Sequence, residues 1–234
     1  MIIDELAARR KNHGEAAPSY FHKTGPGQYQ EKDVFWEIAT PALREVLNAH
    51  PDADREEIES LLQSPVHEAR ACALSLLCRK FRRSDFAGKT EIHRYYLSRL
   101  DRVNGWDLVD ISAPEIVGNY VGETHDESVL DELVLSPDLW RRRVAIVSTW
   151  ALIGKGSLDA TFRITEKLMK DEEDLIHKAC GWMLREAGKQ DRGRLNRFLR
   201  EHYSELSRTT LRYAIERHEE TERKNILKGI FQEE

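Results

Sequence analysis

Hydrophobic and polar positions follow the period of an α-helix along almost the whole chain. Apolar residues recur three and four positions apart, as at Ile58, Leu61 and Leu62, which gathers them on one face of a helix. No segment shows the sustained apolar–polar alternation that is typical of a half-buried strand. The pattern therefore predicts an all-α protein without a β-sheet.

Prolines and acidic residues indicate where several of these helices begin. Thr40-Pro41, Ser136-Pro137-Asp138 and the stretch Asp171–Asp174 each offer a capping residue, a proline or negative charge, all of which suit a helix N-terminus. Lys23–Lys32 is the clearest irregular segment, because it contains two glycines and a proline. We therefore expect N-terminal helices and a Gly/Pro loop in about residues 1–40, and repeated helices in about residues 41–234.

A short motif recurs along the predicted helices at a nearly constant step. Its first copy is Arg70-Ala71-Cys72-Ala73-Leu74, and later copies follow at steps of 37, 36, 35 and 34 residues. Such steps correspond to one helix pair per repeat of the HEAT-like class. Stacked pairs form an α-α superhelix (solenoid) with a concave groove, here as a single domain over residues 1–234. The basic residues that we expect to line up along the groove are Arg70, Arg143, Lys178 and Arg212, whereas Asp107 puts an acid in the same slot.

The composition is compatible with this architecture and also bears on where in the cell the protein is expected. The 234 residues are 40% hydrophobic and 33% charged, which is enough apolar material for a folded chain. No run of about 18 apolar residues occurs that could span a membrane. The N-terminus carries the acidic pair Asp4-Glu5 and no apolar core of a signal peptide. We therefore expect a cytoplasmic protein, and nothing in the sequence indicates that it oligomerises beyond a monomer.

The three cysteines do not indicate a disulfide framework or a metal site. Cys72, Cys78 and Cys180 form an odd set without paired spacing. The chain contains no Cys-x-x-Cys or His-x-x-x-His motif, which zinc sites typically use. Because Cys72 and Cys180 occupy the same position of two repeats, we expect them to pack in the core. The sequence therefore predicts no metal site.

Basic charge is concentrated in two parts of an acidic chain. The formal net charge is −5, yet Arg79–Arg102 contains eight Lys and Arg against three Asp and Glu, and His177–Arg217 contains ten against five. A basic face on an acidic body suits a polyanionic partner such as DNA. The alternative is that these charges are ordinary solvated helix faces.

A possible site emerges when the repeats are aligned on their common slot. Trp106, Asp110, Arg143 and Trp182 then project within roughly 140° of one another, since a helix advances about 100° per residue. Each residue alone has a structural interpretation: the tryptophans as core, Asp110 as a cap or ion-pair partner, and Arg143 as a tie between repeats. Their shared register favours a functional site. Gly181, in the middle of a helix, suggests close packing there.

Four motifs stand out in order along the chain: Arg102-Val103-Asn104-Gly105-Trp106-Asp107-Leu108-Val109-Asp110, Trp140–Val147, His177–Glu186 and Leu211-Arg212-Tyr213-Ala214-Ile215-Glu216. They resemble the motifs of the AlkD-type alkylpurine DNA glycosylases. The likeness runs from about Tyr20 to the last helix. One departure lies near Phe35-Trp36-Glu37, where the family usually has glycine in place of Glu37. This puts an acid near the expected DNA entrance.

The resemblance implies a DNA repair enzyme of base excision repair. Such an enzyme is a monofunctional hydrolase that excises cationic N3- and N7-alkylated purines, of the 3-methyladenine and 7-methylguanine type, from double-stranded DNA and leaves an abasic site. The resemblance implies that the reaction uses no metal or cofactor. It also implies catalytic roles for Trp106, Asp110 and Trp182, and DNA contacts at Tyr20, Arg143, Lys178, Arg185 and Arg212. The alternative is a catalytically silent HEAT-repeat module that binds DNA or protein.

Overall fold

The computed structural model describes residues 1–11 and 24–231, and the regular structure in these residues is helical. The only strand-like pairing among them is an isolated bridge between Val34 and Val66. The chain divides into two compact units, Met1–Ser112 and Ala113–Glu234. Within the described residues no helix combines the length and the apolar character needed to cross a membrane. The all-α prediction is confirmed.

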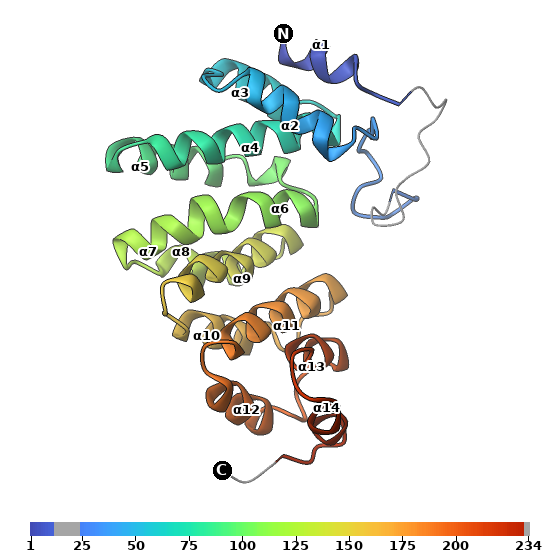
Figure 1. The fold of residues 1–234 in the computed structure, drawn as a ribbon, viewed down its shortest axis with the longest axis vertical. Coiled ribbons are helices and arrows are strands. Elements are labelled where there is room, and N and C mark those ends of the chain that lie inside the picture. The colour runs from blue at the N-terminus through green and yellow to red at the C-terminus, as the bar shows by residue number, and fades with distance from the viewer. Residues whose placement is uncertain (12–23, 232–234) are drawn as a thin grey trace. The chain divides into compact units, whose positions relative to one another are not determined.

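The first unit is built around one long central helix (Figure 1). Its helices are α1 (Ile2–Ala7), α2 (Thr40–Ala49), α3 (Arg55–Leu62), α4 (His67–Arg83), α5 (Phe86–Leu97), a 3₁₀ turn (Leu100–Arg102) and α6 (Trp106–Ala113). The α4 helix packs against α2, α3 and α5, and most of its residues are buried. At the start of α3, the side chains of Asp54 and Glu57 satisfy each other's backbone N–H groups in a capping box.

The second unit consists mainly of successive helix pairs (Figure 1). It contains a π-helical turn (Pro114–Gly118), α7 (Asn119–Thr124), α8 (Ser128–Val134), α9 (Leu139–Gly154), α10 (Asp159–Leu168), α11 (Asp174–Gly188), α12 (Arg192–Glu201), α13 (Arg208–Ala214) and α14 (Glu220–Leu227). The α9 helix begins where its sequence signal predicts, because the Asp138 side chain accepts hydrogen bonds from the amides of Trp140 and Arg141.

The helix-pair repeat is confirmed within these units. The residues of the common slot all fall on the second helix of a pair: Arg70 on α4, Asp107 on α6, Arg143 on α9, Lys178 on α11 and Arg212 on α13. The first four lie in the N-terminal part of their helix, whereas Arg212 lies in the last turn of the short α13. In the second unit, α11 packs between α9 and α13. A Cβ added at Gly181 would lie 2.6 Å from the carbonyl oxygen of Thr210, so this glycine lets α11 and α13 approach closely.

Burial of the cysteines follows the prediction, but two residues of the expected basic column are buried as well: Arg70 is 2% and Arg143 4% exposed. Cys72 and Cys180 are buried, and burial raises the pKa of each thiol to about 12. Such thiols stay protonated and pack as small apolar groups. Arg70 was expected to join an exposed basic column, yet it is only 2% exposed and pairs with Asp33. That expectation is wrong, because the guanidinium serves an internal network instead.

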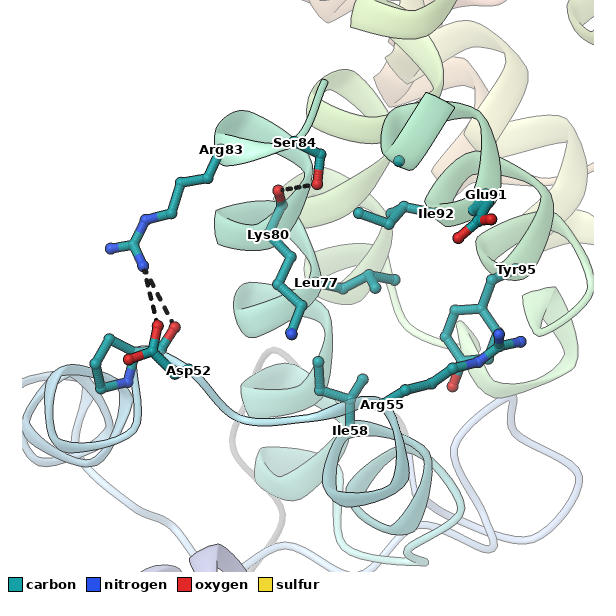
Figure 2. Close-up of a pocket in the computed structure, with 12 residues that line it drawn as sticks. Asp52, Arg55, Ile58, Leu77, Lys80, Arg83, Ser84, Glu91, Ile92 and Tyr95 are labelled. Carbon is teal, nitrogen blue, oxygen red and sulfur yellow. Dashed lines mark hydrogen bonds and ion pairs between the residues drawn. The ribbon is translucent and has the colours of Figure 1, made fainter. Parts of the chain in front are cut away.

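The first unit also contains a cavity of about 390 Å³ between α3, the C-terminal half of α4 and α5 (Figure 2). Ile58 and Leu77 form apolar parts of its wall, and Arg55 lies over the ring of Tyr95 at 4.9 Å. At its rim, Arg83 pairs with Asp52 at 3.9 Å. None of the residues predicted to carry chemistry lines this cavity.

Candidate functional site

The α6 helix carries two of the predicted catalytic residues. Trp106 is its first residue and Asp110 lies one turn later, and both side chains are partly exposed. Leu108 and Val109 are fully buried and anchor the inward face of the helix. Because residues four apart share a helix face, Trp106 and Asp110 present a common surface on the first unit.

The C-terminal half of α6 is fixed from the inside. The Ser112 hydroxyl donates to the carbonyl of Leu108 at 2.6 Å. Since that uses its one proton, the buried Tyr96 hydroxyl donates to Ser112 Oγ, at 2.9 Å. The Cys78 thiol on α4 donates to the carbonyl of Ile111 at 3.7 Å. These contacts tie α6 to α4 and α5 and limit how far it can rotate.

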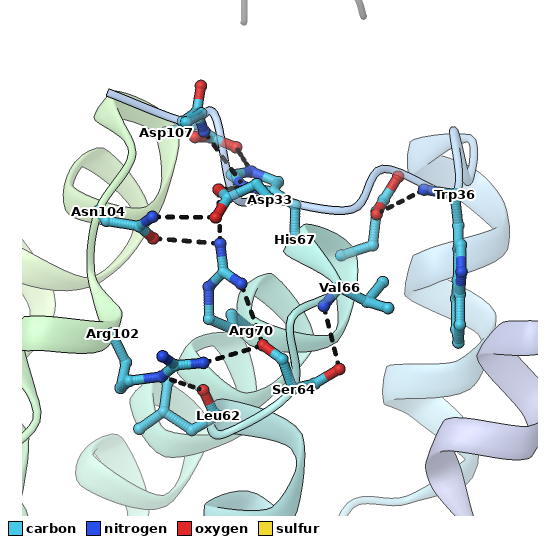
Figure 3. Close-up of polar contacts among 12 residues, drawn as sticks. Asp33, Trp36, Leu62, Ser64, Val66, His67, Arg70, Arg102, Asn104 and Asp107 are labelled. Atoms are coloured by element: carbon cyan, nitrogen blue, oxygen red, sulfur yellow. Dashed lines mark hydrogen bonds and ion pairs between the residues drawn. The ribbon is translucent and has the colours of Figure 1, made fainter. Parts of the chain in front are cut away.

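A polar network holds the N-terminal end of α6 (Figure 3). His67, the first residue of α4, contacts Asp107 through Nε2 at 2.7 Å and Asp33 through Nδ1 at 3.4 Å. Arg70 pairs with Asp33 at 2.6 Å and donates to the side-chain oxygen of Asn104 at 3.1 Å. The Asn104 amide donates to Asp33 at 3.0 Å. The network joins α4, the segment before α2 and the turn that leads into α6.

The network favours the charged forms of His67 and Asp33. Burial alone would lower the pKa of His67, but hydrogen bonds with Asp107 and Asp33 outweigh it and raise that pKa to about 9. For Asp33, burial raises the pKa, yet the contacts with His67, Arg70 and Asn104 bring it below its ordinary value. Near neutral pH, His67 is therefore an imidazolium between two carboxylates.

The segment before α2 is clamped by the next residue of α4. Glu68 is 9% exposed, and its carboxylate accepts from the amides of Trp36 at 3.0 Å and Ile38 at 3.3 Å. Between these amides, Glu37 has a φ of 53°, in the left-handed region where glycine is favoured. This conformation is a physical reason why glycine suits this position, as the resemblance noted from the sequence implies for the family.

Trp182 lies beside a second tryptophan that sequence reasoning missed. The ring of Trp182 on α11 is 6.1 Å from that of Trp150 on α9, at an interplanar angle of 44°. Trp150 is 46% exposed, an unusual exposure for so large an apolar side chain. Its place in the predicted helix gave no signal, because the repeat slots do not include it. The two rings form an aromatic surface on the second unit.

Arg143 is placed between two repeats of the second unit. It is 4% exposed, and its guanidinium donates to the carbonyl of Leu175, in the first turn of α11, at 2.7 Å. The structure therefore gives Arg143 the tying role that the sequence left open. Its predicted contact with DNA phosphate remains a prediction.

The other predicted DNA-contacting residues differ in their surroundings. Lys178 pairs with Asp174 at 2.8 Å and keeps 41% of its side chain exposed. Arg185 pairs with Glu186 at 3.1 Å and with Glu216. Arg212 is exposed, and no ion pair involves it among the residues that the structure describes. Tyr20 lies outside the described residues.

The predicted residues thus divide between the two units. Trp106 and Asp110 belong to the first, and Arg143 and Trp182 to the second; their shared register across repeats remains a prediction. Sequence reasoning missed the network around His67. A signal was present in Asp107, the acid in an otherwise basic slot, but its partner lies 40 residues earlier in the chain. The described residues contain no cluster of three or more His, Cys, Asp or Glu suited to a metal.

Comparisons by sequence and by structure both find proteins described as DNA alkylation repair enzymes. A family model described as DNA alkylation repair enzyme matches residues 2–218 of the chain. Among solved structures, the chain is similar to a predicted DNA alkylation repair enzyme from Enterococcus faecalis. The TM-score is 0.66 and the sequence identity 22%, covering 82% of this chain and 92% of that one. At this identity the likeness establishes a shared fold. No curated protein is similar enough in sequence to match.

Proposed function

Because this chain belongs to the DNA alkylation repair enzyme family, we propose that it is a monofunctional DNA glycosylase. Its substrates are cationic N3- and N7-alkylated purines in double-stranded DNA, and its products are the free base and an abasic site. The observation that carries the proposal is the match over residues 2–218, which includes the α6 face bearing Trp106 and Asp110.

The substrate's charge decides what the protein must supply. An N3- or N7-alkylpurine is already cationic, so the base can leave without a general acid. When the bond between C1′ and N9 breaks, its electron pair neutralises the purine, and positive charge develops on the sugar. Water then adds through its oxygen to C1′ and releases a proton. An anion near the sugar is therefore the most useful group, as in other glycoside hydrolysis.

Asp110 is the residue that we assign to this role. Its carboxylate projects from a helix whose back is fixed by Ser112, Tyr96 and Cys78, and a preorganised charge stabilises a transition state without reorganising during the reaction. The same carboxylate can orient the attacking water and accept its proton. Trp106, one turn earlier, offers an aromatic face to the cationic nucleotide, a contact worth about 0.5–2 kcal/mol.

The second unit supplies aromatic and basic groups for DNA. Trp182 offers a further aromatic face, and its neighbour Trp150 extends that surface. Arg212 and Lys178 are the exposed cations suited to phosphate. We keep Arg143 as a DNA-contacting residue in the proposal.

A direct assay tests the proposed activity. The purified chain is incubated with double-stranded DNA that contains 7-methylguanine, and released base and abasic sites are both quantified. The proposal expects equimolar base and abasic sites, without strand cleavage by the enzyme. DNA binding without base release would instead support a catalytically silent module and would overturn the glycosylase assignment.

A further inference from the structure

The turn before α6 is packed directly against the imidazole of His67. A Cβ added at Gly105 would lie 3.1 Å from His67 Cε1 and 3.0 Å from Gln30 Nε2. Gln30 itself contacts His67 Nδ1 at 3.3 Å, and both residues are buried. The same Cβ would lie 2.9 Å from Asp107 Oδ1, so a side chain at this position would crowd all three residues. The chain therefore enters α6 along a path that His67 defines.

His67 also connects α6 to the segment before α2. Phe35 stacks on the imidazole with ring centroids 4.7 Å apart and an angle of 24°, while Asp33 faces Nδ1. On the opposite side, Nε2 meets Asp107 in the first turn of α6. One side chain on α4 thus joins the segment before α2 to α6, and these contacts leave little freedom for the helix end that begins with Trp106.

We propose that His67 is a positioning residue for catalysis: through Asp107 it fixes the first turn of α6 and so orients Trp106 and Asp110 toward the DNA substrate. The inference rests on the proposed function, because that function supplies the alkylated nucleotide on which Asp110 acts. His67 itself is 3% exposed and does not touch substrate. It acts through the geometry and charge of its neighbour.

The charge of His67 matters as well as its shape. Asp107 and Asp110 are three residues apart, so they are neighbours on the α6 surface. With His67 protonated, the Asp107 charge is balanced by the imidazolium. Other charged groups that face this cluster are Asp33 from the segment before α2, Arg70 on α4 and Arg102 near Arg70. Deprotonation of His67 would remove the positive charge that strengthens its hydrogen bond with Asp107 and would loosen the contact that holds the first turn of α6.

Substitution of His67 separates positioning from folding. His67→Gln keeps a side chain that can hydrogen-bond but removes the charge. At pH 7 we expect its single-turnover release of 7-methylguanine to fall about 10²-fold, because a small misplacement of a reacting group costs that much. The affinity for DNA should change less than about twofold. In the wild type the rate should also decline as pH rises through about 9, and this decline should be absent in the variant.

Glu68→Gln is the matched control. Glu68 is the next residue of the same helix turn and is similarly buried, but its carboxylate binds the amides of Trp36 and Ile38, and within the described residues it forms no hydrogen bond or ion pair with α6. Its single-turnover rate should stay within about twofold of the wild type once the folded fraction is equal. An equal loss in both variants, or a loss that follows the melting temperature, would overturn the positioning role.

A measurement without DNA distinguishes failure of this inference from failure of the proposed function. Nuclear magnetic resonance of the isotope-labelled protein follows the His67 imidazole and the Trp106 indole, the latter identified by its absence in Trp106→Phe. The indole signal should shift with a midpoint of about pH 9 and lose this shift in His67→Gln. An indole signal that ignores His67 would overturn the inference even if the enzyme is active. A coupled signal without base release would overturn the glycosylase assignment alone.

Discussion

At the scale of single residues, many arginines of this chain bind the protein's own carbonyl groups. Arg102 donates to the carbonyls of Leu62, Gln63 and Ser64 at the end of α3. Arg79 donates to the carbonyl of Leu47 near the end of α2. The last carbonyls of a helix lack intrahelical donors and carry partial negative charge, so these guanidinium groups cap them. Much of the basic segment Arg79–Arg102 therefore holds helices together.

Glu37 gives a prediction about backbone strain. A non-glycine residue at a φ of 53° pays a steric cost of about 1–2 kcal/mol. Glu37→Gly should therefore increase the free energy of unfolding by up to about 1 kcal/mol, after the entropy cost of glycine is subtracted. Urea denaturation would measure it. Glu37→Ala is the control, because alanine keeps the strain; an equal gain in that variant would show that the side chain's charge is responsible.

The environment of an individual residue was predictable where its position in the repeat determined it. Cys72 and Cys180 share a repeat position, and both are buried as the pattern indicates. Arg70 shares a slot with Arg143 and Lys178, but the pattern could not reveal that Asp33 and Asn104 surround it. Partners that lie 34 or more residues away in the chain leave no local pattern. The network around His67 was therefore out of reach.

At the scale of helices, the close packing of α11 against α13 depends on a glycine and on a hydrogen bond between the two helices. Gly181 lets α11 approach Thr210 and Tyr213 on α13. The Thr210 hydroxyl also donates to the carbonyl of His177 at 3.1 Å, so the two helices share a hydrogen bond as well. The sequence predicted both the helix pairs and the tight packing at Gly181, because periodicity and a mid-helix glycine are local signals. It could not predict which partner helix the glycine meets.

Gly181→Ala tests this packing. Alanine improves helix propensity by about 1 kcal/mol, but its Cβ would lie 2.6 Å from the carbonyl of Thr210 and would push the helices apart. Overpacking typically costs about 1–3 kcal/mol, so thermal denaturation should show a net loss of stability. At Gly154, an added Cβ meets nothing within 4 Å. Gly154→Ala should therefore gain up to about 1 kcal/mol; a loss there would contradict the explanation.

At the scale of the whole molecule, a chain with a net charge of −5 is proposed to bind DNA. Ion pairs within the protein reduce the number of cations that can bind DNA phosphates. Arg99, for example, binds Glu59 at 3.0 Å, and Arg142 binds Asp171 at 2.6 Å. Binding would then rely on exposed cations such as Arg212, which forms no ion pair within the part of the chain that the structure describes. The two halves of the predicted site lie in separate units, so measurements of DNA binding and catalysis test their cooperation.

The salt dependence of DNA binding tests this distribution. Each phosphate contact contributes about 0.9 to the slope of log affinity against log salt. Arg212→Ala should lower the magnitude of that slope by about 1 and weaken binding to alkylated and unmodified DNA equally. Arg99→Ala, which removes a cation already paired with Glu59, should leave the slope unchanged. Equal effects of the two substitutions would contradict the assignment of Arg212 to phosphate.

The central claim is that the Asp110 carboxylate drives base excision, and Asp110→Asn tests it most directly. Asparagine is nearly isosteric, so the melting temperature and DNA affinity should be preserved while the negative charge is lost. Single-turnover release of 7-methylguanine at saturating enzyme should fall about 10²–10³-fold. An unchanged rate would remove Asp110 from the mechanism. A lower melting temperature with activity reduced only in proportion to the folded fraction would make Asp110 a structural residue and contradict the account.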